Sequence, residues 1–416
     1  MSPPLILLAS LLLGFAGGLA LRATGNPEAA AGADYIVLIG EIWLRALQMT
    51  SLPLLIALLI TGIAGAGDVA ASGRIAGRSL TWIAVLVIGA GLLGTAVILG
   101  FLSLWPVSEE ARSALVAGLG ALGDGTSPAA PPPLREWLIN VIPTNPFGAT
   151  AQGAILSMVV FVLLFALAIT RLPPERRAPL LSFFDSVNLT MMVLVGWVLK
   201  LAPVGAFTLA LGVGLHGGAG AAGAIVQYLL LECAAGGAIL LALYPVAALF
   251  GRISPLRFAR AVASPQVVAA STQSSLATLP AMIAAAEGPL AVPPRVAGVT
   301  LPIAVSIFKV TSATMNLAVV VFTAHVLGLP ITASSLIAGL VVAWLVSFGV
   351  AGLPGASSFF ASIVPVCLAM GVPTTLLAIL VAVEVIPDLF RTVGNVTADV
   401  ALARIVAGRE EINAGS

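Results

Sequence analysis

Apolar stretches long enough to cross a lipid bilayer recur along this chain, and they restrict its fold more than any other feature. The stretches run from Pro4 to Leu21, from about Tyr35 to Ala66, from about Ser79 to Trp105, and over residues 149–171, 183–213 and 222–250. A spanning helix needs about 20 apolar residues, so the chain has room for about eight to ten membrane segments. The pattern predicts an all-α polytopic membrane protein.

The scarcity of charge excludes the main classes of soluble protein. Only 8% of the residues are charged and 60% are hydrophobic, whereas a soluble domain carries about 25% charged residues. A water-exposed surface cannot be built from so few charges, which argues against a soluble enzyme, a nucleic-acid binder and a disordered regulator. Cys233 and Cys367 give no disulfide framework and no metal-ligand spacing.

Basic residues predict the orientation of the chain. They cluster in alternate connectors, at Arg74 and Arg78, at Arg171, Arg176 and Arg177, and at Arg252, Arg257 and Arg260. Because basic loops stay in the cytoplasm, we expect these loops and both termini there, with the protein in the plasma (inner) membrane. The polar connector at 106–136 is expected on the other side. Pro4–Leu21 is interpreted as a retained span, because no basic residue precedes it; a signal peptide is the alternative.

Two apolar segments in the last third of the chain are interrupted by Ser, Gly and Pro. They cover residues 271–280 and 347–358, and the apolar flanks of each are too short to cross a membrane alone. Each is interpreted as a helical hairpin that enters the membrane and returns on the same side. Broken helices of this kind direct free backbone N–H and C=O groups at a ligand. Two kinked spans or a surface loop are the alternative interpretations.

The last span carries five polar residues on one helix face. At about 100° per residue they occupy a stripe about 80° wide. They are Glu384, Asp388, Arg391, Asn395 and Asp399. Charges in a membrane helix seldom face lipid, so the stripe is expected to face a protein interior or an aqueous site. A structural salt-bridge ladder would also explain the charges, but not the neighbouring broken helices.

Other charged residues lie singly in or near apolar stretches. Lys309 lies within Val299–Ala324 and needs an anionic partner, which the stripe can supply. Glu232 and Lys200 are interpreted as residues that pair locally or extend their charge toward the membrane surface. His216 and His325 are interpreted as solvated, because neither has a metal-ligand neighbour.

The order and spacing of these motifs resemble the glutamate transporter family, the dicarboxylate/amino acid:cation symporters. The resemblance runs from QMTSLP at 48–53, IPTNPF at 142–147 and LAPVGAF at 201–207 to the two hairpins and the last span. It implies eight transmembrane spans, two re-entrant hairpins, inverted repeats and a homotrimer. It divides the chain into a scaffold (1–68 and 137–215), an extracytoplasmic connector (106–136) and a mobile transport unit (75–105 and 220–416).

The resemblance also implies roles for individual residues. The implied substrate-binding residues are Ser274, Ser275, Gly352, Pro354, Gly355, Asp388, Arg391, Thr392 and Asn395. The two serines would meet the α-carboxylate, Asp388 the α-amino group, and Arg391 a side-chain carboxylate through its bidentate guanidinium. The second hairpin would be the extracellular gate. Asp399, with Asn395, would bind a sodium ion.

The chain departs from the family where sodium would bind. The family carries Asn-Met-Asp in the seventh span, and the corresponding residues here are Phe308, Lys309 and Val310. A sodium ion needs several oxygen ligands, and this change removes two of the best. We therefore expect Lys309 to supply, near Asp399, the positive charge that relatives import as sodium. Proton coupling through Glu384 is a variant of this hypothesis.

The sequence thus predicts a secondary transporter, not an enzyme, that carries an acidic amino acid by an elevator-type movement. Na⁺ or H⁺ is the expected coupling ion, with sodium coupling altered, reduced or absent. A C4-dicarboxylate carrier or a sodium-independent exchanger is the alternative within this class. A receptor-like or channel-like protein on the same fold is the alternative from another class. No nucleophile–base pair or metal cluster favours a membrane enzyme.

Overall fold

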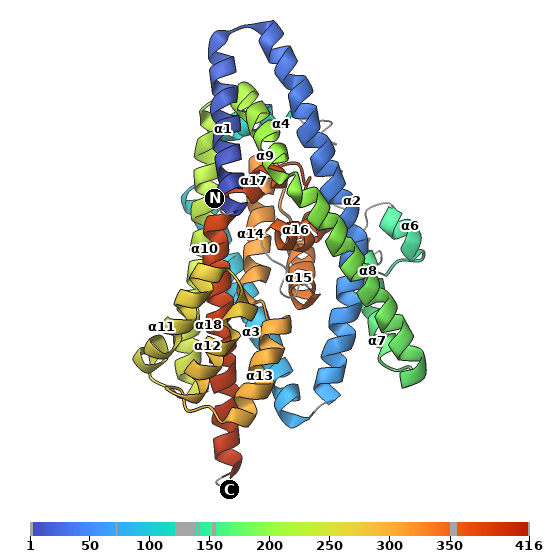
Figure 1. Cartoon of the computed structure of the whole chain (residues 1–416), viewed down its shortest axis with the longest axis vertical. Coiled ribbons are helices and arrows are strands. Elements are labelled where there is room, and N and C mark those ends of the chain that lie inside the picture. Colours follow the sequence, from blue (N-terminus) through green and yellow to red (C-terminus); the bar gives the residue numbers. More distant parts are fainter. Residues whose placement is uncertain are drawn as a thin grey trace.

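The computed structural model describes residues 3–71, 73–120, 139, 142–151, 155–349 and 356–414. Within these ranges all regular secondary structure is helical, so the expected all-α fold is confirmed (Figure 1). Gly352, Pro354 and Gly355 of the second expected hairpin lie outside the described residues.

One group of helices comes from the first half of the chain. It comprises α1 (Pro3–Thr24), α2 (Pro27–Ala71), α6 (Pro146–Ala151), α7 (Ile155–Ile169), α8 (Pro174–Lys200) and α9 (Ala202–Gly212). The long helix α2 packs along α7, α8 and α9, and α1 packs against α9. Figure 1 shows α1 and α2 as an antiparallel pair, joined at Gly25, whose φ is 61°. The expected span over 183–213 starts earlier, at Pro174, and is interrupted at Leu201.

Small residues let α1 approach the chain around α9 closely. A Cβ atom at Gly14 would overlap the backbone carbonyl of Phe207, and one at Gly18 would overlap that of Leu211. The Gly-x-x-x-Gly pair in α1 therefore brings two backbones together, as such pairs do in membrane helices.

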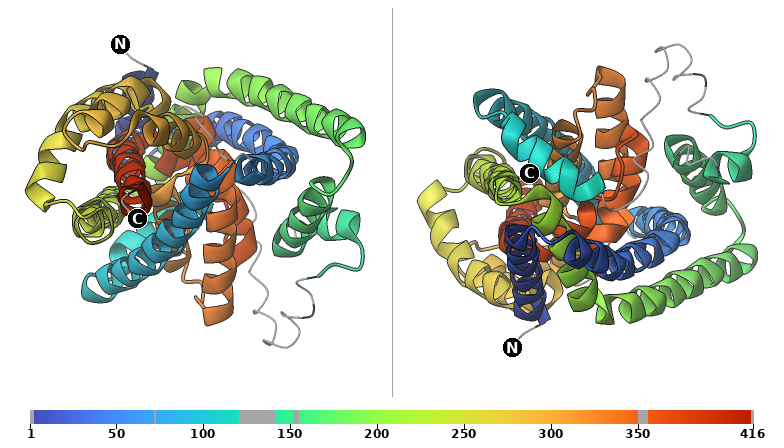
Figure 2. Two further views of the ribbon diagram at one scale, coloured as in Figure 1. Left: turned by 90° about the horizontal axis from the view of Figure 1, so that it is seen from below. Right: turned by 90° about the horizontal axis from the view of Figure 1, so that it is seen from above.

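A second group of helices contains α18 at its centre. It comprises α3 (Arg74–Leu104), α10 (Gly220–Gly251), α11 (Pro255–Thr272), α12 (Ser275–Glu287), α13 (Pro294–Ile307), α14 (Val310–Val326), α15 (Ala333–Gly349), α16 (Ala356–Met370), α17 (Leu377–Val383) and α18 (Val385–Ala414). Helix α18 packs against α3 and α10 to α14, which surround it in the end-on views of Figure 2. Within the polar stripe, Glu384, Arg391, Asn395 and Asp399 are buried and Asp388 is half-buried, so the stripe faces protein.

The helical course of this group is interrupted at three places. Helices α11 and α12 pack as a hairpin joined at Gln273 and Ser274. Helix α13 ends before Phe308 and Lys309, where the backbone is non-helical, and α14 follows directly. Glu384 separates α17 from α18. Each interruption leaves backbone N–H and C=O groups without an intrahelical partner. Helices α15 and α16 also pack together, and the residues that join them lie outside the described part.

Length and composition identify membrane-spanning candidates among the described helices. Four are long and apolar enough: α3, α8, α10, and α13 with α14 taken together, Pro294–Val326. Shorter apolar helices, such as Ala202–Gly217 and Ala333–Ser347, accompany them. The expected connector at 106–136 begins with a helix, α4 (Glu109–Gly120), in which Arg112 pairs with Glu109 at 2.6 Å. Helix α4 packs on α10 and on η1 (Val213–Gly217).

Candidate functional site

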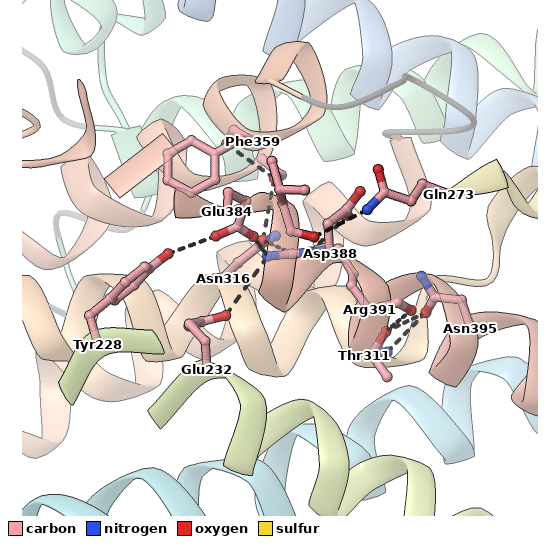
Figure 3. Close-up of polar contacts among 12 residues, drawn as sticks. Tyr228, Glu232, Gln273, Thr311, Asn316, Phe359, Glu384, Asp388, Arg391 and Asn395 are labelled. Atoms are coloured by element: carbon pink, nitrogen blue, oxygen red, sulfur yellow. Dashed lines mark hydrogen bonds and ion pairs between the residues drawn. The ribbon is translucent and has the colours of Figure 1, made fainter. Parts of the chain in front are cut away.

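Arg391, in the second turn of α18, is buried among four polar side chains (Figure 3). Its Nη1 donates a 2.8 Å hydrogen bond to Oδ1 of Asn316 on α14, and its Nη2 donates one of 2.5 Å to Oε1 of Glu384. Nε lies 3.6 Å from Oδ1 of Asp388, and Nη2 lies 3.9 Å from Oε2 of Glu232 on α10. Three carboxylates, from α10, from α18 and from the residue between α17 and α18, therefore surround one guanidinium.

Glu384 reaches the guanidinium because the helix is interrupted there. Its position between α17 and α18 places its carboxylate beside Arg391, two turns further along the chain. The second carboxylate oxygen accepts a 2.7 Å hydrogen bond from the hydroxyl of Tyr228 on α10. Both oxygens of Glu384 are thus hydrogen-bonded, which stabilises the ionised form of this buried group.

Asn395 connects α18 to the start of α14. Its Oδ1 accepts a 3.1 Å hydrogen bond from the backbone N–H of Thr311 and lies 2.7 Å from the Thr311 hydroxyl. That hydroxyl is also 2.8 Å from the backbone oxygen of Arg391. Because α14 begins at Val310, the Thr311 N–H has no partner within its own helix, and Asn395 supplies one.

Lys309 and Asp399 form a deeper pair of buried charges. Lys309 lies between α13 and α14, and its Nζ donates a 2.9 Å hydrogen bond to the backbone oxygen of Val305. Asp399 is fully buried, and neither carboxylate oxygen accepts a hydrogen bond from any described residue. The two charged groups interact electrostatically, so the ammonium partly offsets the carboxylate.

The described residues around Asp399 do not form a full oxygen shell for sodium. Phe308 and Val310 are apolar and completely or almost completely buried. Oδ1 of Asn395 already accepts hydrogen bonds from Thr311. A hard cation needs several oxygen ligands at once, and here a buried ammonium stands near the carboxylate instead.

The joining residues of the α11–α12 hairpin lie next to the start of α18. Gln273 has a left-handed backbone, with φ of 49°, and its Nε2 donates a 3.1 Å hydrogen bond to the backbone oxygen of Val385. Ser274 caps α12, because its hydroxyl accepts a 3.2 Å hydrogen bond from the N–H of Ala277. Ser275 is buried. The N-terminus of α12 therefore lies close to the Glu384–Asp388 turn.

The structure brings together part of the expected site and adds residues to it. Glu384, Asp388 and Arg391 meet in one cluster. Asn395 lies outside this cluster and contacts Thr311. Thr392 is buried, and its side chain makes none of the hydrogen bonds found among the described residues. The sequence did not single out Tyr228, Gln273, Thr311 or Asn316.

One interpretation from the sequence is corrected, and a contact is added to another. Glu232 was expected to pair locally, yet it lies 3.9 Å from Arg391 on another helix. Its position in an apolar span is itself a signal, because an ionisable residue inside a membrane helix usually marks a functional site. His216 was expected to be solvated; its side chain is 32% exposed, and its Nε2 also contacts Oδ1 of Asp34 at 2.8 Å.

Comparison with known proteins gives similarity over nearly the whole chain. The sequence model of the sodium:dicarboxylate symporter family matches residues 5–409. A proton/sodium-glutamate symport protein of Bacillus subtilis (strain 168) is 28% identical over 93% of this chain and 88% of its own length. Neutral amino acid transporter B(0) of Homo sapiens is 30% identical over 95% of this chain and 78% of its own length. The proton/glutamate-aspartate symporter of Escherichia coli (strain K12) is 26% identical over 89% of this chain and 84% of its own length.

Proposed function

Because the chain belongs to the sodium:dicarboxylate symporter family, we propose that it is a secondary transporter that carries an acidic amino acid across the membrane. The family consists of transporters, so the protein is a membrane transport protein and not an enzyme. The proposed substrate is inferred mainly from one observation: the buried Arg391 and the half-buried Asp388 lie together beside the N-terminus of α12. These groups match the three charges of aspartate or glutamate.

The substrate would bind between α12 and α18. Its α-carboxylate would accept hydrogen bonds from the first N–H groups of α12, near Ser274 and Ser275, where the helix dipole favours an anion. Its ammonium would pair with Asp388. Its side-chain carboxylate would use guanidinium N–H groups of Arg391, of which two of five are hydrogen-bonded, to Glu384 and Asn316. Thr392 and Asn395 would complete the pocket, and Gly352, Pro354 and Gly355 would close it.

The movement proposed is an elevator-type displacement of one group of helices past the other. The scaffold would be residues 1–68 and 137–215, the transport unit 75–105 and 220–416, and 106–136 the extracytoplasmic connector. The packing of α1, α2 and α7 to α9 with one another, and of α10 to α14 around α18, supports this division. Eight spans and two re-entrant hairpins, α11–α12 and α15–α16, are part of the proposal.

The assembly proposed is a homotrimer in the plasma (inner) membrane, with both termini in the cytoplasm. Helix α8 exposes the large apolar side chains Phe183, Leu189, Val193 and Trp197, which in a membrane-spanning helix would face lipid or a neighbouring subunit. The C-terminus lies at the same end of the molecule as the join between α2 and α3 (Figure 1). Arg74 begins α3 at that join, which favours a cytoplasmic location for this end.

We propose that substrate transport is coupled to protons, or to fewer sodium ions than in sodium-coupled relatives. Lys309 would provide in place the charge that a sodium ion supplies elsewhere, because its ammonium interacts with the buried Asp399. Phe308 and Val310, on either side of Lys309, support this role of the ammonium, because their apolar side chains offer no oxygen ligand to a sodium ion. Relatives named as proton symporters show that the family can use protons.

Two measurements test this function. In proteoliposomes, labelled aspartate or glutamate should show saturable counterflow, which a receptor or a channel would not give. A thermal-shift screen with aspartate, glutamate, malate, succinate and neutral amino acids, each with sodium and with choline, should then identify the ligand, because a ligand of the folded form raises the melting temperature. Strict, steep sodium dependence would contradict the coupling proposed, and a response to malate or succinate without one to aspartate would favour the C4-dicarboxylate alternative.

A neutral amino acid is the second candidate. Arg391 is already paired with Glu384 at 2.5 Å, so a substrate without a side-chain carboxylate would leave that pair intact. The similarity to neutral amino acid transporter B(0) is consistent with this candidate. A thermal shift with neutral amino acids and none with aspartate or glutamate would favour it.

A further inference from the structure

We propose that Glu232 on α10 binds the proton that is taken up together with the substrate. This inference rests on the proposed transport function and assigns a residue to its coupling. It starts from the position of Glu232 beside Nη2 of Arg391, the same atom that contacts Glu384 (Figure 3).

Glu232 is the least satisfied carboxylate of the cluster. It is fully buried, and neither of its carboxylate oxygens has a hydrogen-bond partner among the described residues. The nearest cation is Nη2 of Arg391, 3.9 Å away, and the same Nη2 already donates to Glu384. Burial of an ionised carboxylate without hydrogen bonds is far more costly than burial of its neutral form.

Of the two fully enclosed acids, Glu232 and Glu384, the hydrogen bonds decide which one carries a proton; Asp388 is half-buried and open to solvent. Glu384 accepts hydrogen bonds from Arg391 and from Tyr228, and these stabilise its ionised form. Glu232 accepts none, so a proton shared by this pair of acids resides on Glu232.

The other titratable groups near Glu232 do not change this assignment. Tyr228 and Cys233 lie on its own helix, and Glu384, Asp388 and Arg391 come from the α17–α18 segment. Among the described residues, the other helices packed on α10, which include α3, α4, α11 and α14, add no charged group that acts on Glu232.

Protonation of Glu232 controls how much of the guanidinium is available. With Glu232 neutral, Arg391, Glu384 and Asp388 together carry a net charge of −1, and ionisation of Glu232 makes the net charge −2. An ionised Glu232 would also take up the Nη2 side of Arg391 and compete with the substrate carboxylate. Substrate and proton therefore favour each other's binding, and by linkage each raises the affinity for the other by the same factor. Loss of the proton on the cytoplasmic side would release the substrate.

The test uses the full-length protein with labelled L-aspartate and L-glutamate as probes. In the wild type, affinity should fall by up to about tenfold per pH unit across the titration of Glu232, and binding should take up about one proton, measured by calorimetry in buffers of different ionisation enthalpy. Glu232→Gln should bind with little pH dependence and take up no proton. In proteoliposomes it should retain counterflow but lose accumulation driven by a pH gradient. Glu175→Gln, at an exposed glutamate on α8, is the matched control and should behave as the wild type.

The possible failures are distinguishable. A Glu232→Gln protein that still takes up a proton, or keeps the wild-type pH profile, would overturn the inference while counterflow keeps the proposed function intact. If that variant does not fold, Glu232→Met, of similar length, takes its place with the same criteria. Wild-type binding of both probes without any proton uptake also overturns the inference, with no variant needed. Absence of counterflow of every amino acid and dicarboxylate in the wild type would instead overturn the proposed function, and the inference with it.

Discussion

The hydroxyl of Tyr228 on α10 donates a 2.7 Å hydrogen bond to Glu384, the residue that separates α17 from α18. The two residues are 156 positions apart in the chain. The Glu384 carboxylate in turn accepts a hydrogen bond from Arg391. Tyr228 therefore orients the Arg391 guanidinium indirectly, through Glu384, and makes no hydrogen bond to Arg391 itself.

Tyr228→Phe should weaken substrate binding without removing it. The substitution leaves one buried oxygen of Glu384 without its donor, at a cost of about 1 to 3 kcal/mol. We expect a lower melting temperature and an aspartate affinity reduced by about tenfold, measured by thermal shift and by binding of labelled aspartate. Tyr35→Phe, at a tyrosine that is 78% exposed, is the control. Wild-type aspartate affinity in Tyr228→Phe would show that the orientation of the Glu384 carboxylate does not depend on this hydrogen bond.

Arg391→Ala should abolish the response to acidic amino acids. It removes the cation that Glu384, Asp388 and Glu232 share, and loss of one partner of a buried ion pair costs about 3 to 5 kcal/mol. The variant should melt at a lower temperature, and aspartate should no longer raise that temperature. Arg176→Ala, at an exposed position on α8, should match the wild type. An unchanged aspartate response in Arg391→Ala would remove this residue from the pocket.

Lys309→Met should make the protein sensitive to sodium. Without the ammonium, the fully buried Asp399 has no positive charge acting on it from the described residues, and the free energy of unfolding should fall by about 3 kcal/mol in choline chloride. Sodium chloride should then raise the melting temperature of the variant more than that of the wild type. The double variant Lys309→Met with Asp399→Asn should lose this sodium effect. Equal sodium responses in Lys309→Met and wild type would contradict the proposed role of Lys309.

Ser274→Ala should affect the hairpin and the substrate together. The Ser274 hydroxyl caps α12, and loss of such a cap costs about 1 kcal/mol. Because the α-carboxylate of the substrate is proposed to bind at this helix terminus, the affinities for aspartate and for glutamate should both fall in Ser274→Ala. Ser271→Ala is the control, because that hydroxyl bonds only within α11, to the backbone oxygen of Val268. A stability loss without any change in affinity would separate the cap from the pocket.

Gly14→Ala should destabilise the contact between α1 and α9. The new methyl group would overlap the backbone of Phe207, and such overpacking costs about 1 to 3 kcal/mol. Gly32→Ala is a matched change in α2, at a glycine with no atom near its Cβ position, and should be neutral or stabilising by about 0.5 to 1 kcal/mol because alanine favours helix. Thermal unfolding in the same detergent compares the two. Equal melting temperatures would show that α1 can shift.

The helical period alone predicted the part of the cluster that lies on one helix. Asp388 and Arg391 are one turn apart and lie on the buried face of α18, as the spacing requires. A re-entrant hairpin was predicted from the polar and proline residues that interrupt 271–280; the structure shows α11 and α12 packed together and joined at Gln273 and Ser274, and insertion of this pair into the membrane stays a prediction. These features are local, so the sequence contains them directly.

The rest of the cluster depends on contacts between distant parts of the chain. Tyr228 and Glu232 lie on α10 and Asn316 lies on α14, and no local pattern shows that these helices face Arg391. The interruption at Phe308 and Lys309 was also not predicted, because neither residue is a helix breaker. Without that interruption, the Thr311 N–H would bond within its own helix and not to Asn395.

Lys309 is part of the polypeptide, whereas an imported ion is bound on one side of the membrane and released on the other. A charge that is covalently fixed to the carrier travels out and back in each cycle and makes no net crossing. It can therefore keep Asp399 neutralised, but it extracts no work from any ion gradient or from the transmembrane voltage. If Lys309 stands in for sodium, uphill accumulation by this protein has to draw its energy from another source, such as protons or the exit of a second solute.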